Sequence, residues 1–278
     1  MSEPTQVTAE MQRECEGYVG RQREAEDMLA PEQAARLAVL LGREAETEFL
    51  PPTYHWLYFA KGIPAGDIGA DMHEKTGIFL PPAPFHRRMW AAGDITVLRP
   101  LKIGTRALRR STIAEVTFKD GRSGQMCFVT VLHEIEQGGN PCISEKQTIV
   151  YRDRGGAEKA LRQAGDPVPE GHFVHPDSML WFYSAATYNG HRIHWDRHFC
   201  REIEGYPDLV VHGPLMATEL CEAMRDRLAP LRFVYRAQAP VFTTTPVRIE
   251  AENAGDLRKG EIRRSDGIVS MTATLNLL

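Results

Sequence analysis

The residues best suited to chemistry lie in one polar stretch, residues 188–198, which reads YNGHRIHWDRH. Its imidazoles can bind a metal or transfer a proton near neutral pH. On a helix, His191, His194 and His198 would share one face, because they are spaced three and four residues apart. With Asp196 they would then form a zinc site. A metal site is therefore the first hypothesis to test.

Several features weigh against a metal in this stretch. Gly190 and the lack of an apolar stripe disfavour a helix, and the cations Arg192 and Arg197 would face the ion. A second interpretation treats the histidines as surface or capping residues without chemistry. The sequence also lacks a glycine-rich nucleotide loop, so we expect neither a metal nor a redox cofactor.

A third interpretation pairs Asn189 with His194, five residues further along the chain. If a helix ends near Tyr188 and the chain turns at Gly190, both side chains can converge on one small molecule without sharing a helical face. One amide and one imidazole suit a bound water molecule. This interpretation predicts a site for adding or removing water.

Two runs in this region resemble the MaoC-like hydratases, hot-dog proteins that hydrate enoyl-CoA thioesters or dehydrate the corresponding hydroxyacyl thioesters. The runs are YSAATYNGHRIHWD at residues 183–196 and VVHGPL at residues 210–215. In that family a GDxNPIH run places an Asp and a His five residues apart on the catalytic water. The resemblance puts His194 on the catalytic His and Asn189 on the Asp, which is replaced here.

With asparagine at this position, the run resembles one subfamily, which also has asparagine there. It comprises the mitochondrial-type 3-hydroxyacyl-thioester dehydratases and the bacterial 3-methylfumaryl-CoA and itaconyl-CoA hydratases. Its degenerate N-terminal hot-dog half resembles DMHEKTG at residues 71–77, PPAPFHRRMWAAG at 81–93 and FKDGRSGQMCFV at 118–129. The likeness runs from about residue 51 onward. It implies an α+β double hot-dog, two antiparallel sheets each wrapped around a helix, with one active site per chain.

The resemblance also implies roles for individual residues. His194 is the base that removes a proton from water, and Asn189 orients that water because an amide cannot act as a base. Gly213, just before Pro214, offers a free N–H at a helix start, which can stabilise the thioester oxyanion. These assignments predict a catalytic set of Asn189, His194 and Gly213.

Further residues are candidates for substrate binding. His191 and Arg192 flank the catalytic pair and could meet a second carboxylate, while Tyr183 and Ser184 could contact the substrate, although packing is their more usual role. A basic set could meet CoA phosphates or a carboxylate. It comprises Arg236, Arg87, Arg88, Arg99, Lys102, Arg106, Arg109 and Arg110.

The predicted elements fall into two similar halves. Residues 1–45 suggest a helical lead-in, residues 111–132 a hairpin turning at Asp120 and Gly121, and residues 142–151 a further strand. Helices are expected over 176–187 and 214–228, followed by strands to the C-terminus. With a linker near 154–172, we expect an N-terminal degenerate hot-dog over 1–162 and a catalytic hot-dog over 163–278.

Composition excludes several functions. The 278 residues are 42% hydrophobic and 25% charged, with a net charge of −4, so we expect a globular protein that binds neither nucleic acid nor membrane. The five scattered cysteines fit reduced thiols in the cytoplasm. Further association into a homodimer is compatible with these features.

Four functions fit this pattern. The first is a hydratase for a short branched dicarboxylic acyl-CoA, converting itaconyl-CoA or 3-methylfumaryl-CoA to (S)-citramalyl-CoA. The second is a 3-hydroxyacyl-thioester dehydratase of fatty-acid synthesis, acting on an acyl-carrier protein or CoA ester. The others are a hot-dog thioesterase and a non-catalytic acyl-thioester binding module. We favour the first, with an acyl-CoA as the binding partner.

Overall fold

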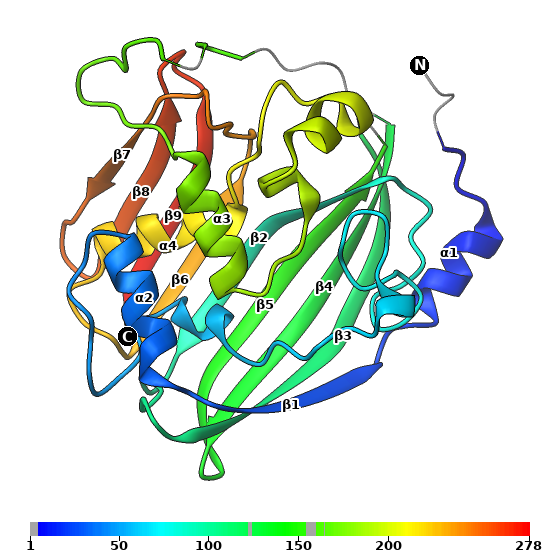
Figure 1. Ribbon diagram of the computed structural model, residues 1–278. Helices are drawn as coiled ribbons and strands as arrows, with labels where there is room; N and C mark the ends of the chain where they lie inside the picture. The colour runs from blue at the N-terminus through cyan, green and yellow to red at the C-terminus, as the bar shows by residue number, and fades with distance from the viewer. Residues whose placement is uncertain (1–4, 122–123, 154–159, 164) are drawn as a thin grey trace.

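The structure is a computed structural model that describes residues 5–121, 124–153, 160–163 and 165–278. Its helices and strands follow one another along the chain as shown in Figure 1. The elements of the N-terminal half are α1 (Ala9–Glu16), β1 (Gln22–Met28), α2 (Pro31–Leu40), η1 (Tyr54–Leu57), η2 (Ala65–Asp67), β2 (Arg87–Val97), β3 (Arg106–Gly121), β4 (Gly124–Gln137) and β5 (Asn140–Arg152). Those of the C-terminal half are α3 (Asp177–Ala186), η3 (Arg192–His194), η4 (Phe199–Glu204), α4 (Gly213–Met224), β6 (Leu231–Ala237), β7 (Val247–Glu252), β8 (Leu257–Arg264) and β9 (Val269–Leu277).

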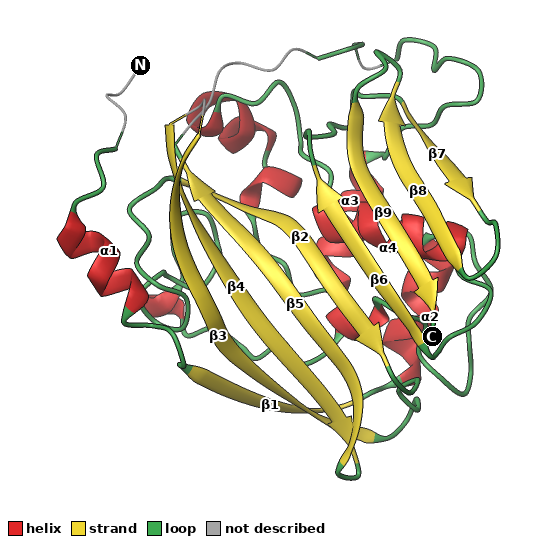
Figure 2. Cartoon of the chain, turned by 180° about the vertical axis from the view of Figure 1, so that it is seen from behind, coloured by secondary structure: helices red, strands yellow, loops and turns green. Residues whose placement is uncertain are grey.

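The strands that the structure describes form one nine-stranded antiparallel sheet in the order β1-β3-β4-β5-β2-β6-β9-β8-β7. The halves join where β2 pairs with β6, from Ala92 opposite Arg236 to Val97 opposite Leu231. Helices α2, α3 and α4 cover one face of the sheet (Figure 1), and the view from behind shows the strands in front of them (Figure 2). The two sheets of the predicted double hot-dog are thus joined edge to edge.

The strand order repeats between the halves. The N-terminal half runs β1-β3-β4-β5-β2, and the C-terminal half runs β7-β8-β9-β6, which is the same order without its first strand. An isolated bridge from Phe173 to Val247 stands beside β7, where that strand would lie. The architectural repeat and the α+β double hot-dog are confirmed.

Helix α4 is the buried helix of the C-terminal hot-dog. Leu215, Leu220 and Met224 are fully buried, and Gly260 on β8 lets the helix approach the sheet closely. A Cβ on Gly260 would lie 2.8 Å from the sulfur of Met224 and 3.2 Å from Leu220 Cδ2. The prediction of helix 214–228 is correct in kind, but the helix ends at Met224, so Leu228 is not part of its stripe.

Two predictions about the N-terminal half need correction. The lead-in over residues 1–45 is not all helical, because β1 crosses it as a sheet edge next to β3. The sequence did not predict this strand, because most of its residues are charged and Ala25 is the one residue in it that is buried. The hairpin is confirmed, but Asp120 and Gly121 are paired residues at the end of β3 rather than the turn.

The predicted linker lies partly outside the described residues, at 154–159 and 164. The division at residue 162 therefore stays a prediction. Over the described part of the chain, no helix is long and apolar enough to cross a membrane.

Candidate active site

The segment after α3 turns as its sequence predicts. The Asn189 N–H donates to Ser184 O at 2.8 Å, and Tyr188 adopts a left-handed φ of 52°. Asn189 Oδ1 then accepts the His191 N–H at 3.0 Å, which closes an Asx turn. The short helix η3 follows and ends at His194. The helix end near Tyr188 and the turn at Gly190 are confirmed.

His194 is held rigidly in the interior. Its residue is 6% exposed, and its Nδ1 lies 2.7 Å from the carbonyl oxygen of Val210, so Nδ1 carries the hydrogen and donates it. Nε2 then bears the lone pair. Burial lowers the pKa of His194 to about 3; the hydrogen bond to Val210 opposes this shift, and His73 adds to it. The imidazole is therefore neutral at physiological pH, as a base must be.

His212 packs against one face of the His194 ring and supports it. The two rings stack with centroids 3.6 Å apart, and Ser184 Oγ lies 2.8 Å from His212 Nε2. The Tyr183 ring packs against His212 with centroids 4.8 Å apart. Tyr183 and Ser184 are thus buried around His212, which makes packing their structural role. His212 was not among the predicted site residues, and its place beside Gly213 was the one available signal in the sequence.

Gly213 begins α4 directly after His212. Among the described residues, none accepts a hydrogen bond from its N–H, because a first-turn donor has no partner within its own helix. A Cβ here would lie 3.4 Å from the Trp90 carbonyl oxygen on β2. The N–H is therefore available beside the histidine pair, as an oxyanion donor requires.

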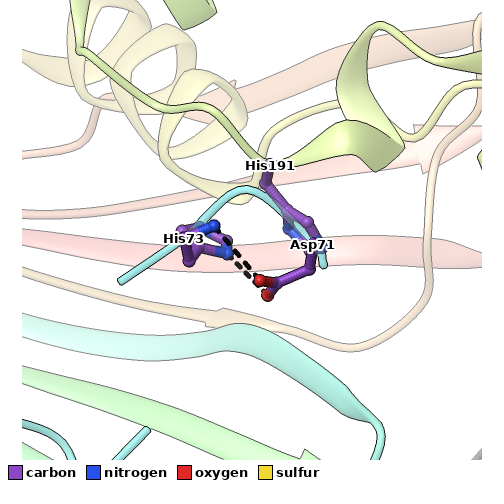
Figure 3. A group of neighbouring side chains, drawn as sticks. All are labelled: Asp71, His73 and His191. Carbon is purple, nitrogen blue, oxygen red and sulfur yellow. Dashed lines mark hydrogen bonds and ion pairs between the residues drawn. The ribbon is translucent and has the colours of Figure 1, made fainter. Parts of the chain in front are cut away.

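A loop of the N-terminal half brings Asp71 and His73 next to His191 (Figure 3). The His73 ring lies 4.4 Å from the His191 ring, and His191 lies 5.4 Å from His194 in an edge-on arrangement. The Arg192 N–H donates to the Asp71 carbonyl at 3.1 Å. In the sequence, the DMHEKTG run indicated only a family resemblance, and nothing in it marked Asp71 and His73 as parts of the site.

The loop brings charge to the site. Asp71 Oδ2 lies 2.9 Å from His73 Nδ1 and 3.6 Å from the Arg88 guanidinium. Burial raises the pKa of Asp71, but the hydrogen bond and charge of His73, together with Arg88, outweigh it and leave that pKa lowered. Burial and Arg88 lower the pKa of His73 to about 4, although Asp71 opposes this. Burial and neighbouring imidazoles also lower the pKa of His191 and His212.

Asp71, His73 and His191 offer ligand atoms that all lie within 4.8 Å of one another. This geometry could hold a divalent ion, but the Arg88 cation beside Asp71 opposes one, and the Asp71–His73 hydrogen bond already explains the closeness. The three histidines that the sequence suggested as zinc ligands, His191, His194 and His198, do not come together in the structure. His198 is exposed, and His194 Nδ1 is bonded to Val210.

Arg192 and Arg236, which were predicted to contact the substrate, have other surroundings in the structure. Arg192 forms an ion pair with Asp196 at 2.6 Å and lies over the Phe199 ring. Arg236 is exposed and alternates with buried Tyr235, so it points to the sheet face opposite the helices. The structure therefore brings together Asn189, His191, His194 and Gly213, and it separates Arg236 from them.

The N-terminal half contains its own buried polar group. Glu145 Oε2 lies 2.8 Å from His55 Nε2, and the Trp56 indole N–H donates to Glu145 at 3.1 Å. Burial raises the pKa of Glu145, but the hydrogen bond and charge of His55 outweigh it and leave that pKa lowered. These partners already satisfy the carboxylate, so the group stabilises the fold around an ionised Glu145.

Comparison with known proteins identifies the class. The family model for hydroxyacyl-thioester dehydratase type 2 matches residues 53–243, so the chain belongs to this family of hydro-lyases. It is 40% identical to the mesaconyl-C(4)-CoA hydratase of Chloroflexus aurantiacus, over 94% of this chain and 96% of the relative. It is 28% identical to the mitochondrial hydroxyacyl-thioester dehydratase type 2 of Schizosaccharomyces pombe, over 77% and 81%.

Solved structures agree on the fold. HtdX of Mycobacterium tuberculosis superposes with a TM-score of 0.68 at 16% identity, over 93% of this chain and 100% of that one. A second mycobacterial protein, described as a double hot-dog, gives a TM-score of 0.53 at 12% identity, over 93% and 96%. The MaoC-like double hot-dog assignment is confirmed.

Proposed function

We propose that this protein hydrates a short branched dicarboxylic acyl-CoA, converting itaconyl-CoA or 3-methylfumaryl-CoA to (S)-citramalyl-CoA. The observation that carries the proposal is the buried His194 imidazole, whose Nδ1 is fixed on Val210 while its ring stacks on His212. His212 directly precedes Gly213, whose N–H has no acceptor in the part of the chain that the structure describes. The similarity to a mesaconyl-C(4)-CoA hydratase over most of both chains supports the choice of substrate.

The proposed mechanism assigns one task to each group. His194 Nε2 removes a proton from a water molecule as its oxygen adds to the β-carbon of the enoyl thioester. Asn189 orients that water with its side-chain amide. The Gly213 N–H, at the positive end of α4, stabilises the negative charge that develops on the thioester oxygen. The α-carbon then takes up a proton.

Arg88 supports the proposed preference for a dicarboxylic substrate. Its side chain is 13% exposed, and among the described residues the one carboxylate within 4.0 Å is Asp71, at 3.6 Å. That distance exceeds a charge-assisted hydrogen bond, so the fork of the guanidinium remains able to bind a carboxylate in two-point fashion. Arg88, a member of the basic set, is therefore our candidate for the distal carboxylate, ahead of Arg192, which is paired with Asp196, and of exposed Arg236.

The proposal is tested with a panel of enoyl-CoA esters, linear and branched, with and without a distal carboxylate. Hydration is followed as loss of the absorbance of the conjugated thioester, and a thiol reagent monitors hydrolysis. We expect dicarboxylic members to react fastest, without release of free CoA. Equal or faster turnover of crotonyl-CoA would contradict the substrate assignment, and thiol release would indicate a thioesterase.

A second candidate is dehydration of 3-hydroxyacyl thioesters, which the family match and the yeast relative favour. The same residues serve both directions, because the transition state is shared. An acyl-carrier-protein substrate turned over much faster than any CoA ester would select this candidate.

A further inference from the structure

The loop between Ile68 and Glu74 is built onto the catalytic segment from the other half of the chain. These two residues form an antiparallel bridge that closes the loop. Arg192 then binds its tip twice, through its backbone N–H to Asp71 O at 3.1 Å and through Nη1 to Ala70 O at 3.4 Å. The loop is therefore held in place by hydrogen bonds rather than by loose surface contact.

The docked loop contains a strained residue. Met72, between Asp71 and His73, has a left-handed φ of 68°, which side chains with a Cβ rarely adopt. A Cβ on Gly190 would lie 2.7 Å from the Met72 carbonyl oxygen, so only glycine lets the loop approach this closely. Strain that the surrounding structure maintains is concentrated at functional sites.

The strained turn presents an Asp–His pair to Asn189. Asp71 Oδ1 accepts the His73 backbone N–H at 3.1 Å while Oδ2 lies 2.9 Å from His73 Nδ1, so Nδ1 carries the hydrogen. The Asn189 amide lies within hydrogen-bonding reach of His73. The His73 side chain is 26% exposed, whereas His194 is almost fully buried. His73 can therefore meet a ligand directly.

Asn189 cannot donate or accept a proton, so the site lacks one proton-transfer group next to the water. We propose that His73, oriented by Asp71, supplies it as the second catalytic imidazole, and this rests on the proposed hydration. His194 takes one proton from water as the hydroxyl adds to the β-carbon. His73, which is neutral at rest, takes up a proton from solvent at Nε2 when the negative charge develops on the substrate and gives that proton to the α-carbon. His194 returns its proton to solvent, so both imidazoles end neutral and the sum is one water added. In dehydration, His73 removes the α-proton.

The two imidazoles are separated by an assay that needs no hydration. A saturated dicarboxylic acyl-CoA has no hydroxyl to eliminate, so exchange of its α-hydrogen in D2O, read by NMR, reports the α-carbon base alone. We expect His73→Gln to abolish this exchange and His194→Ala to retain it. Both variants lose hydration, with kcat lower by about 10²–10⁴ and KM nearly unchanged. His86→Ala, on an exposed histidine of the same half, is the matched control and keeps both activities.

Imidazole rescue distinguishes proton transfer from a structural role. In His73→Ala, added imidazoles should restore hydration, to an extent that follows the pKa of the imidazole added. Asp71→Asn should lower kcat about 10-fold or more while His73 remains.

Near wild-type hydration by His73→Gln, or α-exchange that survives in it, would overturn the role of His73. Stoichiometric zinc in the purified protein that is lost in His73→Ala would also overturn the role of His73, because Asp71 and His73 would then be zinc ligands. If the wild-type chain hydrated no enoyl-CoA at all, the proposed function itself would fail instead.

Discussion

The rings of His194 and His212 stack with centroids 3.6 Å apart and planes inclined by 20°. His194 belongs to the turn after α3, and His212 immediately precedes α4, so this contact joins the proposed base to the proposed oxyanion donor. Val210 strengthens the link, since its carbonyl binds His194 Nδ1 and its N–H donates to Ile193 O at 2.9 Å. The segment from Val210 to Gly213 therefore positions both groups together.

The first prediction concerns His194. His194→Ala should lower kcat for hydration by about 10²–10⁴, because among the described residues no other imidazole binds the Val210 carbonyl oxygen and could replace the lost base. Steady-state kinetics on the preferred dicarboxylic ester measures this, with exposed His198→Ala as the matched control. Unchanged turnover in His194→Ala would remove the base from the mechanism.

Asn189→Asp introduces the residue that the resemblance to the MaoC-like hydratases predicts at this position. A carboxylate can still accept a hydrogen bond from the water, so we expect retained or modified activity rather than loss. The new charge will alter its contact with His73 and its bond from the His191 N–H. Comparison of kcat across the ester panel tests this, and a fully inactive variant with an intact fold would contradict it.

Gly213→Pro should lower kcat by about 10²–10³, because it removes the N–H that we propose as the oxyanion donor. Proline is well accommodated in a first helical turn, so α4 should persist. Gly213→Ala is the matched control, since it keeps the N–H and places its Cβ 3.4 Å from Trp90 O. The oxyanion role fails if the proline variant turns over like the alanine variant.

The sequence predicted the local part of the site and not its distant part. Asn189 and His194 are close along the chain, and Gly190 marked the turn between them, so spacing sufficed. Asp71 and His73 reach the site only because β2 pairs with β6 and thereby joins the two halves. The residues around Asp71 and His73 give no indication of the pairing between β2 and β6. Strand β1 was missed for a related reason, since only the long-range partner β3 makes its charged residues a strand.

Ser184→Ala should destabilise the fold by about 1–3 kcal/mol, because it leaves the buried His212 Nε2 without its partner. Within the described residues His212 Nδ1 already has no hydrogen-bond partner, so in Ser184→Ala packing alone would hold the ring. Urea unfolding measures the change, with Ser178→Ala on the exposed side of α3 as the control. Equal midpoints for the two variants would show that this hydrogen bond contributes nothing.

The histidine group also predicts how stability depends on pH. The pKa is lowered to about 3 for His194 and about 4 for His73, so each binds fewer protons in the folded than in the unfolded chain. Their contribution is therefore complete above the unfolded pKa of about 6.5 and is lost as pH falls through the range below it. The lowered pKa of Asp71 adds a loss only below about pH 4.

Between about pH 6 and pH 4.5, each such histidine contributes a slope approaching about 1.4 kcal/mol per pH unit. Urea midpoints should therefore fall steeply from pH 6.5 to pH 4.5. Glutamine does not titrate, so His194→Gln, although less stable at pH 7.5, should show a shallower fall than the wild-type chain. Parallel curves for the two proteins would mean that His194 is not held neutral by burial, and the base would then need another means of remaining unprotonated.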